Sequence, residues 1–239
     1  MTDPLQQEPK ASPGLVSLAI QSITQHIRSE ELKAGDLLPS ESELTRRLNV
    51  SRTVVREAFR SLSAMRLIDM SPGRRASVAK LDVGAMSMVI EHGLTTKQIT
   101  VQQVYDVRRA IEMRTVALAA LRRSDAEAAE IQQHARLIRE HLRTPERIVE
   151  HDIAFHEAIA RASHNPVFAL IVTGLSSVMP QTWKVGWRAR QSEADQLKMI
   201  ASHEAVADAI LKGDPRAAVE TMADHFDSSV KALVEAGFA

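Results

Sequence analysis

The sequence contains no cysteine, which excludes disulfide bonds, thiolate-bound zinc and cysteine nucleophiles. Aromatic residues make up only 3% of the 239 residues, so aliphatic side chains must fill the interior, which favours packed helices over sheets. Apolar stretches such as residues 169–172 fall far short of the roughly 18 residues that a membrane-spanning helix needs. Residues 1–14 contain no apolar segment of the kind found in signal peptides. These absences predict a soluble, cytoplasmic protein that has no membrane partner.

Charge is balanced overall but is unevenly distributed along the chain. The 30 Lys and Arg residues equal the 30 Asp and Glu residues, yet residues 14–80 carry 11 basic against 7 acidic side chains. A local basic excess of this kind is typical of modules that bind a polyanion. The sequence therefore predicts an N-terminal module that binds a polyanion, followed by a mildly acidic C-terminal part.

The N-terminal part shows the start and stop signals of short helices. Residues 1–13 hold three prolines and are expected to form a flexible tail. Apolar residues then follow helical spacing over residues 15–27. Ser40 and Glu43 have the spacing of a capping box, which predicts a second helix that ends at Leu48.

A third helix is predicted over residues 52–65, with Ser51 as its N-cap. At roughly 100° per residue, Arg52, Arg56 and Arg60 fall on one face, while the apolar residues fall on another. Guanidinium groups in a row can bind phosphates or read guanine edges. The same row is also typical of a solvated basic face, so the helix alone leaves both interpretations open.

The segments after this helix decide between the two interpretations. Residues 67–70 and 76–78 are β-prone and are joined by a basic turn that contains Arg74 and Arg75. Three helices followed by such a hairpin predict a winged helix-turn-helix, whose third helix enters the major groove of DNA. The pattern therefore favours a DNA-reading helix.

The segments LLPSESEL, NVSRTVVREAFRSL, RLI and PGR resemble the DNA-binding domain of GntR-family regulators, over roughly residues 15–79. The resemblance implies that double-stranded operator DNA is contacted by Ser40, Ser51, Arg52, Thr53, Arg56, Arg74 and Arg75. A symmetric pair of recognition helices on a palindromic operator predicts a homodimer.

Three positions depart from the usual pattern of that family. Ser42 stands where an arginine is frequent, which implies that one DNA contact is weakened or lost. Arg66 replaces a common glycine at the end of the third helix. Arg75 replaces the glycine of the wing tip, where we expect a conformational cost because glycine takes positive φ easily, together with an added charge near DNA.

The remainder of the chain carries dense helix signals and no strand pattern. Helices are expected over residues 82–92, 101–122, 125–142, 145–163, 166–188, 192–212 and 215–235. The predicted fold class is mainly α. It comprises a winged helix-turn-helix domain at residues 14–79, a linker at 80–84, and an all-helical bundle of six or seven helices at 85–236.

Asp152 and His156 lie four residues apart in HDIAFHEAIA, on one face of a predicted helix. This spacing lets a carboxylate and an imidazole converge on one ion, although it equally suits an Asp–His surface pair. His203 and His225 each lie beside an apolar stripe of a later helix, and convergence of all four would leave open positions on an octahedral metal. Most other histidines are expected on the surface or in packing: His26, His92, His134, His141 and His164.

The segments VYDVRRAIEMRTVALAA, HDIAFHEAIARASHNP, SHEAVADAILKGDPRAA and ADHF resemble the FCD effector domain of the FadR subgroup, over nearly all of residues 82–235. The resemblance implies a divalent metal, zinc first and manganese or nickel as alternatives, held by Asp152, His156, His203 and His225. It also implies that Arg108 binds the carboxylate of an effector.

A hydroxy acid fits such a site because its carboxylate and neighbouring hydroxyl can chelate the ion together. The chain is most similar to the sugar-acid (aldonate) branch of the family. We therefore expect a metabolite-responsive repressor that a small carboxylic acid releases from DNA.

Two other classes of function compete with this one. His151 and Asp152 form the HD pair of helical metallohydrolases, but that class needs both as ligands, and His151 is turned away by about 100° on a helix. A purely structural, nucleoid-type DNA binder would have no ligand pocket. Trp183 and Trp187, one helical turn apart, are expected in the core or an interface rather than in a pocket.

Overall fold

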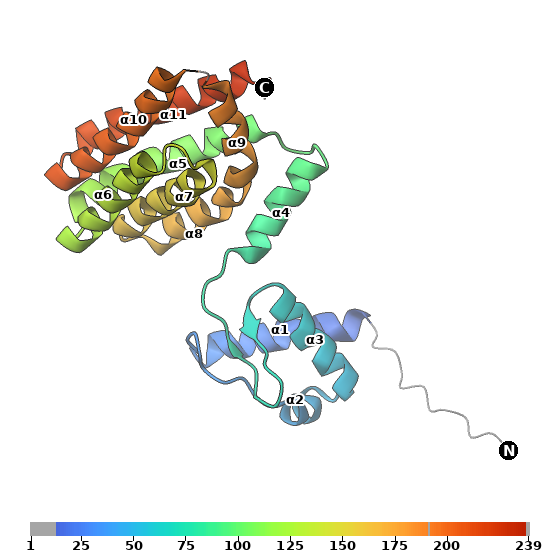
Figure 1. Ribbon diagram of the computed structural model, residues 1–239. Helices are drawn as coiled ribbons and strands as arrows, with labels where there is room; N and C mark the ends of the chain where they lie inside the picture. Colours follow the sequence, from blue (N-terminus) through green and yellow to red (C-terminus); the bar gives the residue numbers. More distant parts are fainter. Residues whose placement is uncertain (1–12, 191, 238–239) are drawn as a thin grey trace. The chain divides into compact units, whose positions relative to one another are not determined.

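The computed structural model describes residues 13–190 and 192–237 (Figure 1). The chain forms two compact units that divide between Ala85 and Met86. Pro13, expected in the flexible tail, is the first residue of a helix, and the rest of that expected tail, residues 1–12, lies outside the described residues.

The N-terminal unit is a winged helix-turn-helix, as the sequence predicts. Its elements are α1 (Pro13–Ser29), α2 (Glu41–Leu48), α3 (Arg52–Ala64), β1 (Ile68–Asp69) and β2 (Ser77–Val78). The two strands pair antiparallel, with Ile68 opposite Val78. The core of this unit is aliphatic apart from one ring and includes Ile23, Leu38, Val55, Phe59, Leu62 and Ile68.

Serine side chains start both helices of the helix-turn-helix. The Ser40 hydroxyl accepts a hydrogen bond from the Glu43 backbone N–H at 3.2 Å, and the Ser51 hydroxyl accepts one from Val54 at 3.3 Å. Glu43 pairs with Arg47 one turn later. The two hydroxyls thus satisfy backbone donors that would otherwise lack an intrahelical partner.

The conformational cost that the sequence predicts at Arg75 is absent, because Arg75 does not have a positive φ. Gly73 is the residue of the wing with a positive φ, of 73°, whereas Arg75 adopts ordinary backbone angles. The Nε of Arg75 donates to the Leu38 carbonyl oxygen at 3.0 Å and so ties the wing to the segment before α2. Arg66, at the end of α3, has a φ of 59°. Of the two arginines that stand where the family has glycine, Arg66 is therefore the one that adopts a left-handed backbone, which is costly for a bulky residue.

Replacing Arg66 with glycine is expected to stabilise the N-terminal unit by about 1 kcal/mol, because glycine adopts this backbone conformation without steric cost. Urea denaturation measures the change. Arg66→Ala is the matched control, since it removes the weak, exposed ion pair with Asp82 but keeps the Cβ that makes the conformation costly. Equal stability of the glycine and alanine variants would contradict the prediction.

The C-terminal unit is entirely helical within the described residues. Its elements are α4 (Gly84–Thr95), α5 (Val101–Arg122), α6 (Asp125–Glu140), α7 (Pro145–Ala162), α8 (Pro166–Leu175), the 3-10 turn η1 (Ser176–Val178), α9 (Met179–Ala189), α10 (Glu193–Lys212) and α11 (Pro215–Glu235). In Figure 1, α5 and α7 lie in the middle of this unit. The helix α5 packs against α7 and α11, and α10 packs against α6 and α11.

One helix predicted from the sequence is two helices in the structure, while the other predicted helices differ from the observed ones by at most a few residues at their ends. The continuous helix expected over residues 166–188 is broken at η1 into α8 and α9. Pro180 accounts for the break, because it lies in the first turn of α9 and a proline cannot donate the backbone hydrogen bond that a continuous helix requires. The break separates α9 from α8 and allows it to line a cavity in the bundle.

None of the helices in the described ranges has an apolar window of the length that a lipid bilayer would demand. The main core of the C-terminal unit consists of aliphatic side chains with a few rings, including Val116, Ile131, Ile138, Ile148, Phe155, Ile159, Ile200, Ile210, Met222 and Phe226. This core fixes α7, α10 and α11, the helices that carry the candidate site.

Candidate metal centre and nucleic-acid interface

Four buried side chains from three helices meet in the C-terminal unit. Helix α7 supplies Asp152 and His156, α10 supplies His203, and α11 supplies His225. One possible ligand atom of each residue lies within 4.8 Å of those of the other three. The spacing of four residues on α7 places its two side chains on the same face, and the distant histidines join them through helix packing.

Two of the three imidazoles use Nδ1 for a hydrogen bond inside the protein. His156 Nδ1 lies 2.5 Å from a carboxylate oxygen of Glu112, and His203 Nδ1 lies 3.0 Å from the Met199 carbonyl oxygen. Both partners are acceptors, so each ring donates through Nδ1. A neutral imidazole then keeps its lone pair on Nε2, the atom that can bind a metal.

The third imidazole is oriented in the same way by a serine. Ser202 donates its hydroxyl hydrogen to the Met199 carbonyl at 2.6 Å, so its oxygen accepts from His225 Nδ1 at 3.0 Å. Burial lowers the pKa of His225 well below its ordinary value, and the neighbouring imidazoles lower it further. The ring is therefore neutral at physiological pH, the form that binds metals.

Asp152 has one carboxylate oxygen that lacks a partner. Its Oδ1 lies 2.7 Å from His203 Nε2, while Oδ2 is buried without a hydrogen bond. Burial alone would raise the pKa of Asp152, but the neighbouring imidazoles of His203, His156 and His225 outweigh it and hold the pKa low. An ionised, partly unsatisfied carboxylate is costly to bury, and a shared cation would remove that cost. These residues fit a metal ion.

Glu112, to which the sequence analysis gave no role, connects two residues of the site. One carboxylate oxygen accepts from His156, and the other accepts from Arg108 Nε at 2.8 Å. Burial raises the pKa of Glu112, but Arg108 and His156 outweigh burial and lower it, so the group is ionised. The spacing of four residues between Arg108 and Glu112 on α5 was the available signal, since it is typical of helical ion pairs.

Replacing Glu112 with glutamine is expected to weaken metal binding by roughly 10- to 100-fold, because it removes the carboxylate that orients His156. Competition with a chromophoric chelator, on protein shown to be folded by circular dichroism, measures the affinity. Asp106→Asn, an exposed change on the same helix, serves as the control. Unchanged affinity in the Glu112 variant would show that His156 is oriented without it.

Arg108 is fixed in the wall of the site and is only 1% exposed. Besides Glu112, its guanidinium contacts the Met179 sulfur and lies 5.6 Å from the ring centres of both Tyr105 and Phe226. Burial alone would lower the pKa of Arg108, but the carboxylate of Glu112 raises it. The charge of Arg108 is therefore balanced inside the protein.

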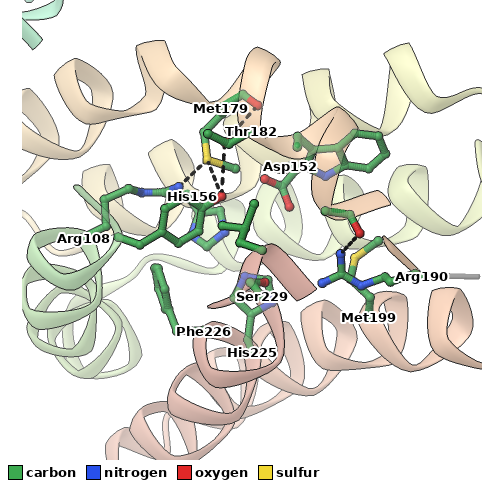
Figure 2. A pocket seen from close by; sticks show the side chains of 14 residues that line it. Arg108, Asp152, His156, Met179, Thr182, Arg190, Met199, His225, Phe226 and Ser229 are labelled. Carbon is green, nitrogen blue, oxygen red and sulfur yellow. Dashed lines mark hydrogen bonds between the residues drawn. The ribbon is translucent and has the colours of Figure 1, made fainter. Parts of the chain in front are cut away.

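Three of the four clustered residues, Asp152, His156 and His225, border a small cavity of about 30 Å³ (Figure 2). Its wall also includes Arg108, residues of α9 such as Thr182 and Trp183, and Arg190. Trp183, expected in the core or an interface, is buried in the core and also lines this cavity, with its ring stacked on Trp187. The volume suffices for an ion and a water molecule.

The arginines of α3 and the wing differ in their partners. Arg56 pairs with Glu41 of α2 at 2.9 Å, and Arg60 pairs with Glu57 of its own helix at 2.6 Å. Arg52 and Arg74 are exposed and form no ion pair with any described residue. These two guanidiniums are thus available for phosphates or bases.

His151 takes no part in the candidate metal centre. Its ring lies 5.2 Å from that of His141 and 5.9 Å from that of His134, between α6 and α7. His164, also expected outside the site, pairs with Glu127 at the surface. The HD pair therefore does not form a common ligand set here.

Two family models match the chain. The model of the FCD domain matches residues 103–228, and the model of bacterial regulatory proteins of the gntR family matches residues 15–78. The solved structure of Streptococcus agalactiae GntR is similar in fold, with a TM-score of 0.66 and 23% sequence identity, and the match covers 89% of this chain and 97% of that chain.

Several characterised relatives match along most of their length. The galactonate operon transcriptional repressor of Escherichia coli K12 is 31% identical over 207 residues, which cover 84% of this chain and 89% of that protein. The HTH-type transcriptional regulator LutR of Bacillus subtilis 168 is 30% identical over 203 residues, 83% and 92% of the two chains. The Glc operon transcriptional activator of Escherichia coli K12 is 28% identical over 228 residues, 92% and 89% of the two chains.

Proposed function

This chain belongs to the GntR family of bacterial regulatory proteins and is a DNA-binding transcription regulator rather than an enzyme, and we propose that its FCD domain senses a small carboxylic acid through a bound divalent metal. In this proposal residues 14–79 bind the operator, residues 80–84 link the domains, and residues 85–236 hold the metal and the acid. Binding of the acid releases the repressor from DNA.

The observation that carries this proposal is the orientation of the three imidazoles. Each donates through Nδ1 to an acceptor of the protein, which leaves three Nε2 lone pairs beside the ionised carboxylate of Asp152. Three imidazoles and one carboxylate are ligands that zinc accepts, and we propose zinc as the resident ion, with manganese or nickel as alternatives. When bound, the ion supplies a positive charge that polarises and holds an acid.

The acid is a sugar acid or a hydroxy acid in this proposal. Its carboxylate and neighbouring hydroxyl would chelate the ion, and Arg108 in the cavity wall would donate charge-assisted hydrogen bonds. The relative that is named for the galactonate operon supports the aldonate branch, and its description as a repressor supports release from DNA on binding of the acid.

The DNA-binding half acts as a dimer on a palindromic operator. Arg52 and Arg56 at the N-terminal end of α3 would contact the major groove together with Thr53, and Arg74 of the wing would enter the minor groove. Ser40 and Ser51 would present their helix N-termini to phosphates, and Arg75 would add charge beside them.

Fluorescence anisotropy with a labelled DNA duplex from the region upstream of the protein's own gene tests the proposal. Metal-loaded protein is expected to bind this duplex and to be released by added sugar acids or hydroxy acids, whereas protein treated with a chelator binds but does not respond. Metal analysis of the purified protein accompanies the titration.

Arg52→Ala serves as the control for specific binding and is expected to lose roughly 10- to 100-fold in affinity for the duplex. Binding of DNA only in the presence of the acid would reverse the direction of regulation. A metal-loaded protein that responds to no acid would contradict the sensing proposal.

A further inference from the structure

The cavity wall contains a second arginine, Arg190, which forms no ion pair with any described residue. Arg108 is paired with Glu112 at 2.8 Å, whereas no carboxylate within the described ranges lies at ion-pair distance from Arg190. The two side chains lie on opposite sides of the cavity in Figure 2, with Asp152 and His225 between them. The site is therefore electrostatically asymmetric.

Arg190 lies at the C-terminal end of α9 and turns back along it. Its Nη1 donates to the Gly186 carbonyl oxygen at 2.8 Å, and its backbone carbonyl accepts from the side chain of Gln196 at 3.3 Å. The side chain is partly buried, and burial lowers the pKa of Arg190, which the carboxylate of Asp152 opposes. A guanidinium has five N–H donors, and the bond to Gly186 leaves others for a ligand in the cavity.

The charges around the cavity define what a ligand must bring. Arg108 and Glu112 form an ion pair, Arg190 and Asp152 carry opposite charges, and imidazoles that bind a metal are neutral, so these groups carry no net charge without the ion. A divalent ion would then leave an excess of two positive charges in a buried space. Because uncompensated charge is costly to bury, a ligand with two negative charges is favoured over one with a single charge.

We propose that Arg190 is a second anion-binding residue of the effector site and that the effector is a hydroxy dicarboxylic acid. One carboxylate and its neighbouring hydroxyl bind the metal, and the other carboxylate binds the guanidinium of Arg190. This inference rests on the proposed function and narrows it, because it selects aldaric and hydroxy diacids over aldonic and other monoacids.

A purely structural role for Arg190 makes a different prediction. A basic side chain at a helix C-terminus stabilises the last carbonyl groups, and the bond to Gly186 is of this kind. Loss of such a cap lowers the stability of α9 and weakens all ligands alike. The ratio of affinities for a diacid and a matched monoacid therefore separates the two roles.

Isothermal titration calorimetry of the zinc-loaded, full-length protein provides this ratio. The matched pairs are malate against 2-hydroxybutanoate and galactarate against galactonate. Wild-type protein is expected to favour the diacid of at least one pair by roughly 10- to 100-fold, the strength of one charge-assisted bond.

Arg190→Gln is expected to bring that ratio close to one while the affinity for the monoacid stays the same, and Arg190→Lys keeps part of the preference. Arg188→Gln, an exposed change on the same helix, is the matched control and keeps the full ratio. Equal binding of diacids and monoacids by wild-type protein, or an unchanged ratio in Arg190→Gln, overturns the role of Arg190 and leaves metal-dependent sensing intact. Binding of none of the four acids to zinc-loaded wild-type protein overturns the sensing proposal itself.

Discussion

Replacing His203 with alanine is expected to remove the metal from the protein and, with it, the metal-dependent part of its stability. His203 is fully buried, its Nε2 faces Asp152 Oδ1 at 2.7 Å, and its Nδ1 is held by the Met199 carbonyl. Because a neutral ring has one N–H, and Met199 takes it, Nε2 and Oδ1 face each other as two lone pairs that a cation would bridge. Without this imidazole the ion lacks one ligand, and Asp152 Oδ1 loses the group that it faces.

The expected loss of stability follows from mass action. An ion at 100 times its dissociation constant stabilises the folded state by about 2.7 kcal/mol, and the variant loses this amount. Thermal unfolding with and without a chelator, together with metal analysis, measures both effects. Wild-type protein is expected to unfold at a lower temperature with the chelator, whereas the variant is insensitive to it.

His92→Ala is the matched control, because His92 is exposed on α4 and contributes nothing to the cluster. It is expected to retain the metal and the sensitivity to the chelator. Stoichiometric metal in the His203 variant, with unchanged affinity, would contradict the assignment of this histidine as a ligand.

Replacing Arg108 with alanine is expected to destabilise the protein by about 3–5 kcal/mol, because it leaves the Glu112 carboxylate buried without its cation. Both side chains are only 1% exposed, so bulk solvent screens the pair little. The variant also loses the contacts of the guanidinium with the rings of Tyr105 and Phe226. Chemical denaturation measures the change in the free energy of unfolding.

Two controls separate the buried charge from the lost packing. The double variant Arg108→Met with Glu112→Gln removes both charges and retains volume, and it is expected to lose much less stability than Arg108→Ala. Arg109→Ala breaks an exposed ion pair with Asp227 on the neighbouring helix and is expected to cost less than about 1 kcal/mol. A loss of under about 1 kcal/mol in Arg108→Ala would show that Glu112 is not ionised in the folded protein.

Local signals explain why much of the fold could be predicted. Ser51 caps α3, Ser124 caps α6, and Pro145 and Pro215 stand in the first turns of α7 and α11, so residues a few positions apart suffice to fix these helix starts. The break at η1 was missed because the apolar composition of residues 166–188 continues through Pro180. A proline is tolerated both in the first turn of a helix and at a kink, so its position relative to a helix start was not evident.

Only part of the candidate site could be predicted from the sequence. The spacing of Asp152 and His156 on one helix face is a local property, and the resemblance to a known effector domain added His203 and His225. The role of Glu112 depends on contact with His156, 44 residues later in the chain. Whether Arg190 forms an ion pair depends on which carboxylates lie near it, and no spacing along the chain specifies that.

By itself, the sequence determined the mainly helical fold, the winged helix-turn-helix, the faces of α3 and α7, and the residue types that could bind a metal, because each follows from side chains within a few residues of one another. Only the tertiary structure decided which imidazole nitrogen faces the cluster, and that Glu112 connects Arg108 with His156. It also decided that Arg66 rather than Arg75 has the left-handed backbone, and that Arg190 lines the cavity without an ion pair to any residue in the described ranges. The physical reason is that hydrogen-bond partners and charge balance in a buried site are set by the packing of separate helices.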